Sequence, residues 1–214
     1  NDPATWVGGV VPNMSVDDAI VADGHLVVIE PDSYIVLVDG RTLTVNSGGM
    51  LGVVGGLEVF FYGSLYVGGE LIAISGSYVS IYDEGNAEIS SGASGSLDGS
   101  LDVAYYAYLN VYGEMTVGTS GSIYAVYDGY VNVSGGTITV HGYLELYDYA
   151  YMDLDGGTVT VESSGEAYIG GYVHCGYGGS VHVYGELTVT TYGYIEAVYS
   201  SEITCESSGV LSVD

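Results

Sequence analysis

The sequence has no lysine, no glutamine and a single arginine, Arg41, against 27 acidic side chains. The formal net charge of -26 excludes nucleic acid and anionic lipid surfaces as partners, because both would repel the chain at long range. No apolar run approaches the roughly 18 residues of a membrane-spanning helix. We therefore expect a soluble chain without membrane insertion.

Cysteine and phenylalanine are also scarce. Cys175 and Cys205 are the only cysteines, and no C-x-x-C pair or histidine spacing of a zinc site accompanies them. Phenylalanine occurs twice against 23 tyrosines. Because tyrosine joins an apolar ring to a hydroxyl group that prefers water, this ratio predicts large areas of half-buried sheet around an aliphatic core.

An apolar–polar–apolar triplet recurs from Leu57 onward, and most units begin about six to eight residues after the previous one. A period of two predicts short strands with one face inward and one face outward. The phrases VYGEMTV (111–117) and VYGELTV (183–189) then each contain the end of one strand, a glycine corner and the start of the next strand. Helical spacing is missing, so no helices are expected.

Short strands with short turns are compatible with an antiparallel sandwich or barrel, which is the main structural alternative. These strands are too short for a usual hairpin sheet, and the repeat continues without the longer crossovers of a sandwich. We therefore predict an all-β, single-chain parallel β-helix, or β-solenoid, with turns stacked about 4.8 Å apart. A right-handed coil is expected, because parallel crossovers overwhelmingly adopt that hand.

The number of strands per coil is open between three and four, for coils of about 22 or about 29 residues. We favour the larger coil, because Cys175 and Cys205 lie about 30 residues apart at equivalent strand positions. In a four-strand coil they would be stacked neighbours. They are then candidates for a disulfide.

Residues 1–56 are less regular than residues 57–214. The first part contains a distinctive set of elements: Trp6-Val7-Gly8-Gly9, Pro12, Asp17-Asp18, His25–Ile29 and Leu43–Gly49. In these elements the chain resembles secreted prokaryotic parallel β-helix proteins, such as adhesin passenger domains and surface filament subunits. The resemblance implies an extracellular or cell-surface location. We interpret residues 1–56 as a cap or subunit-joining segment with irregular first strands, and residues 57–214 as one continuous domain of regular repeats.

Because many parallel β-helix proteins are polysaccharide lyases or hydrolases, an enzyme is one alternative. A lyase needs an arginine or lysine base, and the chain has only Arg41, in its irregular part. A hydrolase needs two carboxylates about 5 to 9.5 Å apart, which Glu58, Asp102, Glu145 and Asp153 could supply by stacking. In so acidic a chain such proximity is uninformative. We therefore expect no enzymatic activity and no catalytic residues.

Oxygen ligands gather at two places in the sequence, and they are calcium candidates: Asp83, Glu84 and Asn86, and Asp153 and Asp155. Neither group matches an EF-hand or the glycine-rich nonapeptide calcium repeat. We expect loose binding of calcium as a counterion and no dedicated cofactor.

Other polar positions carry weaker signals. His174 and His182 are both middle residues of strands and could meet on one face, although a metal would need a third ligand. Asn13 and Asn132 begin glycosylation sequons. The tyrosines suggest either sugar binding by ring stacking or ladders of rings along the sheet, and ring ladders are the plainer interpretation.

The functional prediction comes from the end of the repeat, Val210–Val213, after which no residues are expected to form a cap. An open coil edge pairs with another strand by addition, and two different ends build a head-to-tail filament. The predicted function is thus a structural subunit of an extracellular filament whose partners are copies of itself. The candidate interface residues are Trp6, Val10, Val11, Val210, Leu211 and Val213. An adhesin or carbohydrate-binding stalk that contacts surface glycans is the alternative, and a polysaccharide-degrading enzyme is the third possibility.

Overall fold

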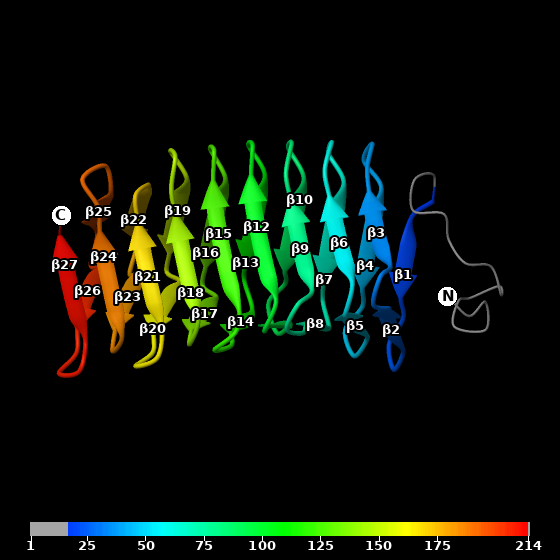
Figure 1. The fold of residues 1–214 in the computed structure, drawn as a ribbon, viewed down its shortest axis with the longest axis horizontal. Coiled ribbons are helices and arrows are strands. Elements are labelled where there is room, and N and C mark those ends of the chain that lie inside the picture. The colour runs from blue at the N-terminus through cyan, green and yellow to red at the C-terminus, as the bar shows by residue number, and fades with distance from the viewer. Residues whose placement is uncertain (1–16, 214) are drawn as a thin grey trace.

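The computed structural model describes residues 17–213, which form 27 strands in three parallel sheets of nine strands each. The chain visits the three sheets in turn, so three consecutive strands make one coil. Figure 1 shows the coils side by side along the long axis, from β1 at one end to β27 at the other. Within residues 17–213 there is no helix, and hence none long and apolar enough to cross a membrane.

We name the sheets A, B and C in the order in which the chain enters them. Sheet A, whose outer face carries most of the site described below, contains β1 (Ala19–Val21), β4 (Thr42–Val45), β7 (Ser64–Val67), β10 (Asn86–Ile89), β13 (Tyr108–Val111), β16 (Tyr130–Ser134), β19 (Tyr151–Asp155), β22 (Tyr172–Gly176) and β25 (Tyr194–Ala197).

The other two sheets close the coil. Sheet B contains β2 (Leu26–Ile29), β5 (Met50–Val53), β8 (Glu70–Ala73), β11 (Ser94–Leu97), β14 (Glu114–Val117), β17 (Thr137–Val140), β20 (Thr158–Val161), β23 (Ser180–Val183) and β26 (Glu202–Cys205). Sheet C contains β3 (Tyr34–Leu37), β6 (Gly56–Val59), β9 (Tyr78–Ile81), β12 (Ser100–Ala104), β15 (Ser122–Val126), β18 (Tyr143–Leu146), β21 (Glu166–Ile169), β24 (Glu186–Val189) and β27 (Val210–Val213).

Successive coils pair in parallel and in register. Leu43 of β4, for example, lies opposite Leu65 of β7, which sets the coil at about 22 residues. The prediction of an all-β parallel β-solenoid is confirmed, whereas the preference for four strands and about 29 residues per coil is wrong. Three four-residue strands and three corners of two to four residues already close the coil, so there is no room for a fourth strand.

The core follows directly from the period-two pattern. In β13 the side chains of Leu109 and Val111 are buried, while Tyr108 and Asn110 point outward. Register places each inward residue against its equivalents in the neighbouring coils, as in the column Leu57, Val79, Leu101, Ile123 and Leu144 of sheet C. The interior is a continuous aliphatic ladder, and burying such side chains is the main stabilising term of the fold.

The corner between sheets C and A requires unusual backbone conformations. In the corner from β9 to β10, Asp83 and Glu84 both adopt left-handed angles, with φ of 48° and 65°. Gly85 follows, and a Cβ there would lie 2.3 Å from the carbonyl oxygen of Val59 in the preceding coil. The Glu84 N–H donates to the carbonyl oxygen of Tyr105 in the next coil at 3.2 Å. Stacking therefore offsets the cost of the left-handed residues, which is about 1–3 kcal/mol each.

The first strands, β1 to β5, join the same three sheets as the later ones, with Ala19 opposite Leu43 and Leu26 opposite Met50. The predicted division at residue 56 gave residues 1–56 the role of a cap or subunit-joining segment, and that role stays a prediction. Trp6, Val10, Val11 and Asn13 lie outside the described residues.

The last coil differs from the interior ones. Its inward positions continue the apolar columns, yet Leu211 and Val213 of β27 are 48% and 75% exposed. Val210 at the start of the same strand is also exposed. Within residues 17–213, β25, β26 and β27 each pair on one side only. We call the inward residues of this coil the C-terminal rim: Ile195, Ala197, Ile203, Cys205, Leu211 and Val213.

Candidate functional site

A column of five tyrosines covers the outer face of sheet A. They occupy the first positions of β13, β16, β19, β22 and β25: Tyr108, Tyr130, Tyr151, Tyr172 and Tyr194. Neighbouring ring centroids are 4.9 to 6.2 Å apart, and three of the four contacts are nearly parallel. Because the stacked rings cover one another's faces, most of the column presents ring edges and hydroxyl groups. These contacts stabilise the sheet, and the interior rings leave no free face for a sugar.

An amide ladder runs beside the first part of this column. Asn110 Nδ2 donates to Asn86 Oδ1 at 2.8 Å, and Asn132 Nδ2 donates to Asn110 Oδ1 at 2.9 Å. Asn132 was predicted as a glycosylation candidate, and its Nδ2 is the atom to which a glycan would be attached. That atom already contacts Asn110, so a glycan there would meet the ladder directly.

Further along the same row, a histidine and two carboxylates form a network. His174 Nδ1 lies 2.9 Å from Asp153 Oδ1, and His174 Nε2 lies 3.7 Å from Glu196 Oε1. The hydroxyl groups of Tyr172 and Tyr194 donate to the two oxygens of Glu196 at 2.5 and 3.3 Å. The bond to Glu196, helped by burial, strongly raises the pKa of Tyr172. The network therefore joins the tyrosine column to the polar row.

The candidate binding site is a hollow beside this network, at the corner between sheets C and A. The corner from β21 to β22 has only two residues, Gly170 and Gly171, whereas the corners before and after it span 147–150 and 190–193. The missing residues leave a hollow of about 460 Å³, which we call the tyrosine notch. The side chains that line it are Tyr147, Asp148, Tyr149, Tyr172, Tyr192 and Tyr194.

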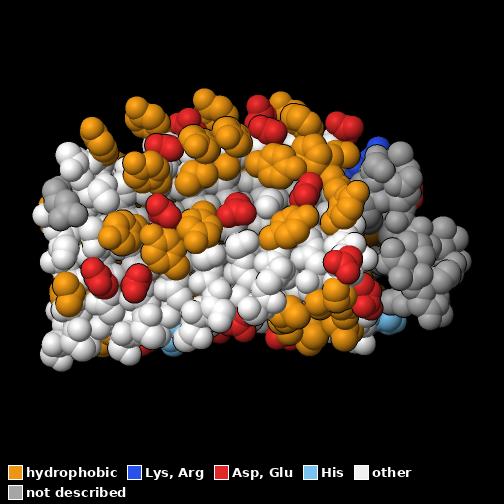
Figure 2. Space-filling model, in the orientation of Figure 1, with side chains coloured by type: hydrophobic (Ala, Val, Ile, Leu, Met, Phe, Trp, Pro, Cys, Tyr) orange, Lys and Arg blue, Asp and Glu red, His pale blue; other side chains and the backbone are white. Residues whose placement is uncertain are grey.

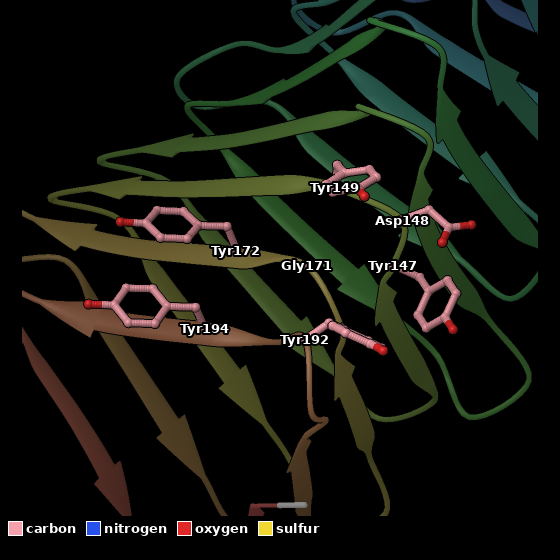
Figure 3. Close-up of a pocket in the computed structure, with 8 residues that line it drawn as sticks. Tyr147, Asp148, Tyr149, Gly171, Tyr172, Tyr192 and Tyr194 are labelled. Atoms are coloured by element: carbon pink, nitrogen blue, oxygen red, sulfur yellow. The ribbon is translucent and has the colours of Figure 1, made fainter.

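Figure 3 shows how these side chains surround the short corner. Tyr149 lies on the coil before Gly171 and Tyr192 on the coil after it. The two rings are 85% and 84% exposed, so neither contributes to the core. Glycine is required at both short-corner positions, because a Cβ on Gly171 would lie 2.3 Å from the Ala150 carbonyl oxygen and one on Gly170 would lie 2.6 Å from the ring of Tyr147.

The notch also interrupts a run of backbone hydrogen bonds. From Phe61 to Asp148, each corner between sheets C and A donates an N–H to a carbonyl oxygen of the next corner. The last of these bonds joins the Asp128 N–H to the Asp148 carbonyl oxygen at 3.3 Å. Within residues 17–213, the N–H groups of Asp148 and Tyr149 have no backbone acceptor, because the two-residue corner does not reach them.

The two predicted groups of calcium ligands lie three coils apart. Asp83 and Glu84 lie in the corner before β10, and the Asn86 side-chain oxygen accepts from Asn110. Three coils further along, Asp153 of β19 contacts His174 in the next coil. Asp155 lies at the end of the same strand as Asp153. Within residues 17–213 no group of three or more histidine, cysteine or acidic side chains is arranged to hold a metal. Loose calcium binding stays a prediction.

The two histidines, which could have met on one face, lie on different sheets. His174 lies on sheet A, opposite Asp153 and Glu196, while His182 lies on sheet B, opposite Thr160 and Thr204. A three-strand coil separates them, because positions eight residues apart fall on different faces of the solenoid.

The cysteines are separated for the same reason. Cys175 lies opposite Ala197 in sheet A, and Cys205 lies opposite Val183 in sheet B. Both are free, so the predicted stacked disulfide is not formed. Burial, with a smaller contribution from Asp153, raises the pKa of the Cys175 thiol to about 11.

The predicted carboxylate pairs do not form by stacking. Glu145 lies between Tyr124 and Tyr168, and Asp153 lies between Asn132 and His174.

The other two carboxylates are also kept apart. Ser80 separates Glu58 from Asp102, since it lies opposite both. The hydroxyl groups of Tyr78 and Tyr82 each donate to Glu58 at 3.2 Å.

The tyrosine notch was not predicted from the sequence. The signal was present as a change in corner length, since Gly170-Gly171 replaces the four-residue corners YDYA (147–150) and TTYG (190–193). This change in corner length can be recognised only once the coil length is known, because the corners to be compared lie one coil apart.

Comparison with known proteins adds little to this site. No family profile matches the chain, and no curated protein matches it. Among solved structures, the chain is similar to a crystal structure of a TibC-catalysed, hyper-glycosylated TibA fragment spanning residues 55–350. The two chains are 20% identical, the match covers 90% of this chain and 82% of the other, and the TM-score is 0.28.

Proposed function

We propose that the chain is a structural subunit of an extracellular or cell-surface filament, which grows by head-to-tail stacking of β-solenoid coils. The observation that carries the proposal is the C-terminal rim. Its inward side chains are aliphatic apart from Cys205 and continue the core columns, and within residues 17–213 they are partly or largely exposed. A second parallel coil is the natural complement of such a surface, because it would satisfy three strand edges and bury the apolar columns together.

The distribution of charge supports the same proposal. The acidic side chains lie among hydrophobic ones on the flank seen in Figure 2, and the net charge of -26 opposes side-by-side association. The inward rim residues carry no formal charge, so stacking at the rim removes no charged group from water. Contact between two different ends is heterologous and extends without closing unless it forms a ring.

Electron microscopy and light scattering across a range of protein and salt concentrations test this proposal. We expect filaments or a concentration-dependent rise in mass. Leu211→Asp should abolish assembly, because it places a charge on the rim, whereas Ser212→Asp, on the outward face of the same strand, should leave assembly intact. A uniform monomer under every condition, or equal behaviour of the two variants, would contradict the filament.

The proposal includes no enzymatic activity and no bound cofactor. Two of the four candidate carboxylates are engaged, since Glu58 accepts from the hydroxyl groups of two tyrosines and Asp153 contacts His174. Release of reducing ends or unsaturated products from neutral or acidic polysaccharides would overturn this part of the proposal. A role in glycan binding, as on an adhesin stalk, is the second candidate function, and the tyrosine notch favours it.

A further inference from the structure

We propose that the tyrosine notch binds one uncharged sugar ring of a glycan. The sugar ring would occupy the space left by the two-residue corner Gly170-Gly171. This site lies on the flank of the solenoid and does not depend on filament formation. Three features carry the proposal: the spacing of the flanking corners, the hydrogen-bonding groups without a backbone partner and the charge of the surroundings.

The spacing comes from the fold itself. Tyr149 and Tyr192 belong to corners two coils apart, which corresponds to about 9.6 Å at the usual strand spacing. A sugar ring held at the level of the coil between them would lie about one strand spacing, 4.8 Å, from each corner, which is within the range at which rings stack. In other coils, side chains of neighbouring corners stack directly on one another at this position, as with Tyr105 and Tyr127, whose ring centroids are 5.1 Å apart. Gly171 has no side chain that could stack between Tyr149 and Tyr192.

The hydrogen-bonding groups suit a hydroxylated ligand. The N–H groups of Asp148 and Tyr149 lack a backbone acceptor, and the equivalent groups of earlier corners point toward the next coil, which here is the side of the notch. The Asp148 carboxylate also lines the hollow and can accept from hydroxyl groups. Thr190 Oγ1, which is buried without a hydrogen-bond partner, would lie 3.2 Å from a Cβ on Gly170. A sugar both donates and accepts, so it matches donors and acceptors at once.

The charge of the protein selects among sugars. With a net charge of -26, and with Asp148 in the wall of the notch, an acidic sugar would be repelled. A pyranose presents apolar C–H faces to the flanking rings and hydroxyl groups at its edge, so it fits a tyrosine-lined slot without needing a charge. A quaternary ammonium group is the rival ligand, because aromatic rings beside a carboxylate also attract cations.

Ligand-observed nuclear magnetic resonance and calorimetry with cellohexaose, maltohexaose and chitohexaose test the site in the full chain. We expect saturable binding of at least one of these neutral sugars. Tyr149→Ala and Tyr192→Ala should each weaken binding by about fivefold or more, because each removes one stacking face. Both side chains are highly exposed, so these variants should keep the wild-type unfolding midpoint.

Tyr62→Ala is the matched control. Tyr62 lies at the equivalent corner position with nearly the same backbone angle, φ 66° against 67° for Tyr149, and is 66% exposed. Its loss should leave binding unchanged. The proposal is overturned if no neutral sugar binds, if Tyr62→Ala weakens binding as much as Tyr149→Ala, or if only polygalacturonate or choline binds. Filament assays on Tyr149→Ala should match the wild type, so failure of one proposal is distinguishable from failure of the other.

Discussion

Leu101 and Leu211 lie in the same column of sheet C, point the same way and belong to the same sequence pattern, yet they are 1% and 48% exposed. The difference is that, within residues 17–213, Leu101 has a coil on both sides and Leu211 has a coil on one side only. Burial in a solenoid is thus a property of stacking, because no single coil can bury its own inward face. The interior coils and the C-terminal rim are the same structure with and without a neighbour.

The sharpest way to test this comparison is to truncate both leucines. Leu101→Ala should lower the free energy of unfolding by about 2–5 kcal/mol, because it opens a cavity in a closed core. Leu211→Ala should lower it by less than about 1 kcal/mol in dilute protein, since the side chain is half exposed already. Urea unfolding of both variants measures the difference. Equal losses of unfolding free energy in the two variants would mean that Leu211 is as buried as Leu101, which would contradict an open C-terminal rim.

A smaller effect is expected from the amide ladder on the outer face. Asn110 makes side-chain hydrogen bonds to both Asn86 and Asn132, so Asn110→Ala should cost about 1–2 kcal/mol of unfolding free energy. Asn86→Ala removes only one of these bonds and should cost about half as much. Chemical denaturation of the two variants checks the ratio, and an Asn86 loss as large as that of Asn110 would contradict the ladder.

The two cysteines show the same contrast between interior and rim, in their reactivity toward thiol reagents and not in stability. Cys175 is buried and Cys205 is exposed, so a chromogenic thiol reagent at pH 8 should modify one thiol in the native protein and two after unfolding. Rapid modification of both native thiols would contradict the burial of Cys175.

The thiol of Cys175 also predicts the direction of a pH effect. Its pKa is raised from 9.0 to about 11, chiefly by burial, so the folded state favours the protonated form. The corresponding stability is present below about pH 9 and is lost as pH rises toward about 11, because the unfolded thiol ionises first. Cys175→Ala should make this decline shallower, while Cys205→Ala should leave it unchanged.

Much of the fold could be predicted from the sequence, because the period-two triplets and glycine corners act locally. The coil length could not, since four-residue strands with short corners fit three or four strands equally well until the register is known. The preference for the larger coil rested partly on Cys175 and Cys205, whose spacing agreed with that coil by coincidence. The tyrosine notch depends on comparing corners one coil apart, such as Gly170-Gly171 with residues 147–150, so it too required the register.

Hydrogen exchange measured by mass spectrometry, at low and high protein concentration, tests the central claim most directly. We expect amides of the interior strands β10 to β15 to be protected at both concentrations, and those of β25 to β27 to exchange quickly in dilute protein. At high concentration β25 to β27 should become protected as a second coil covers the rim. Full protection of these three strands in the dilute monomer, or fast exchange at every concentration, would contradict a C-terminal rim that is open alone and closed by another copy.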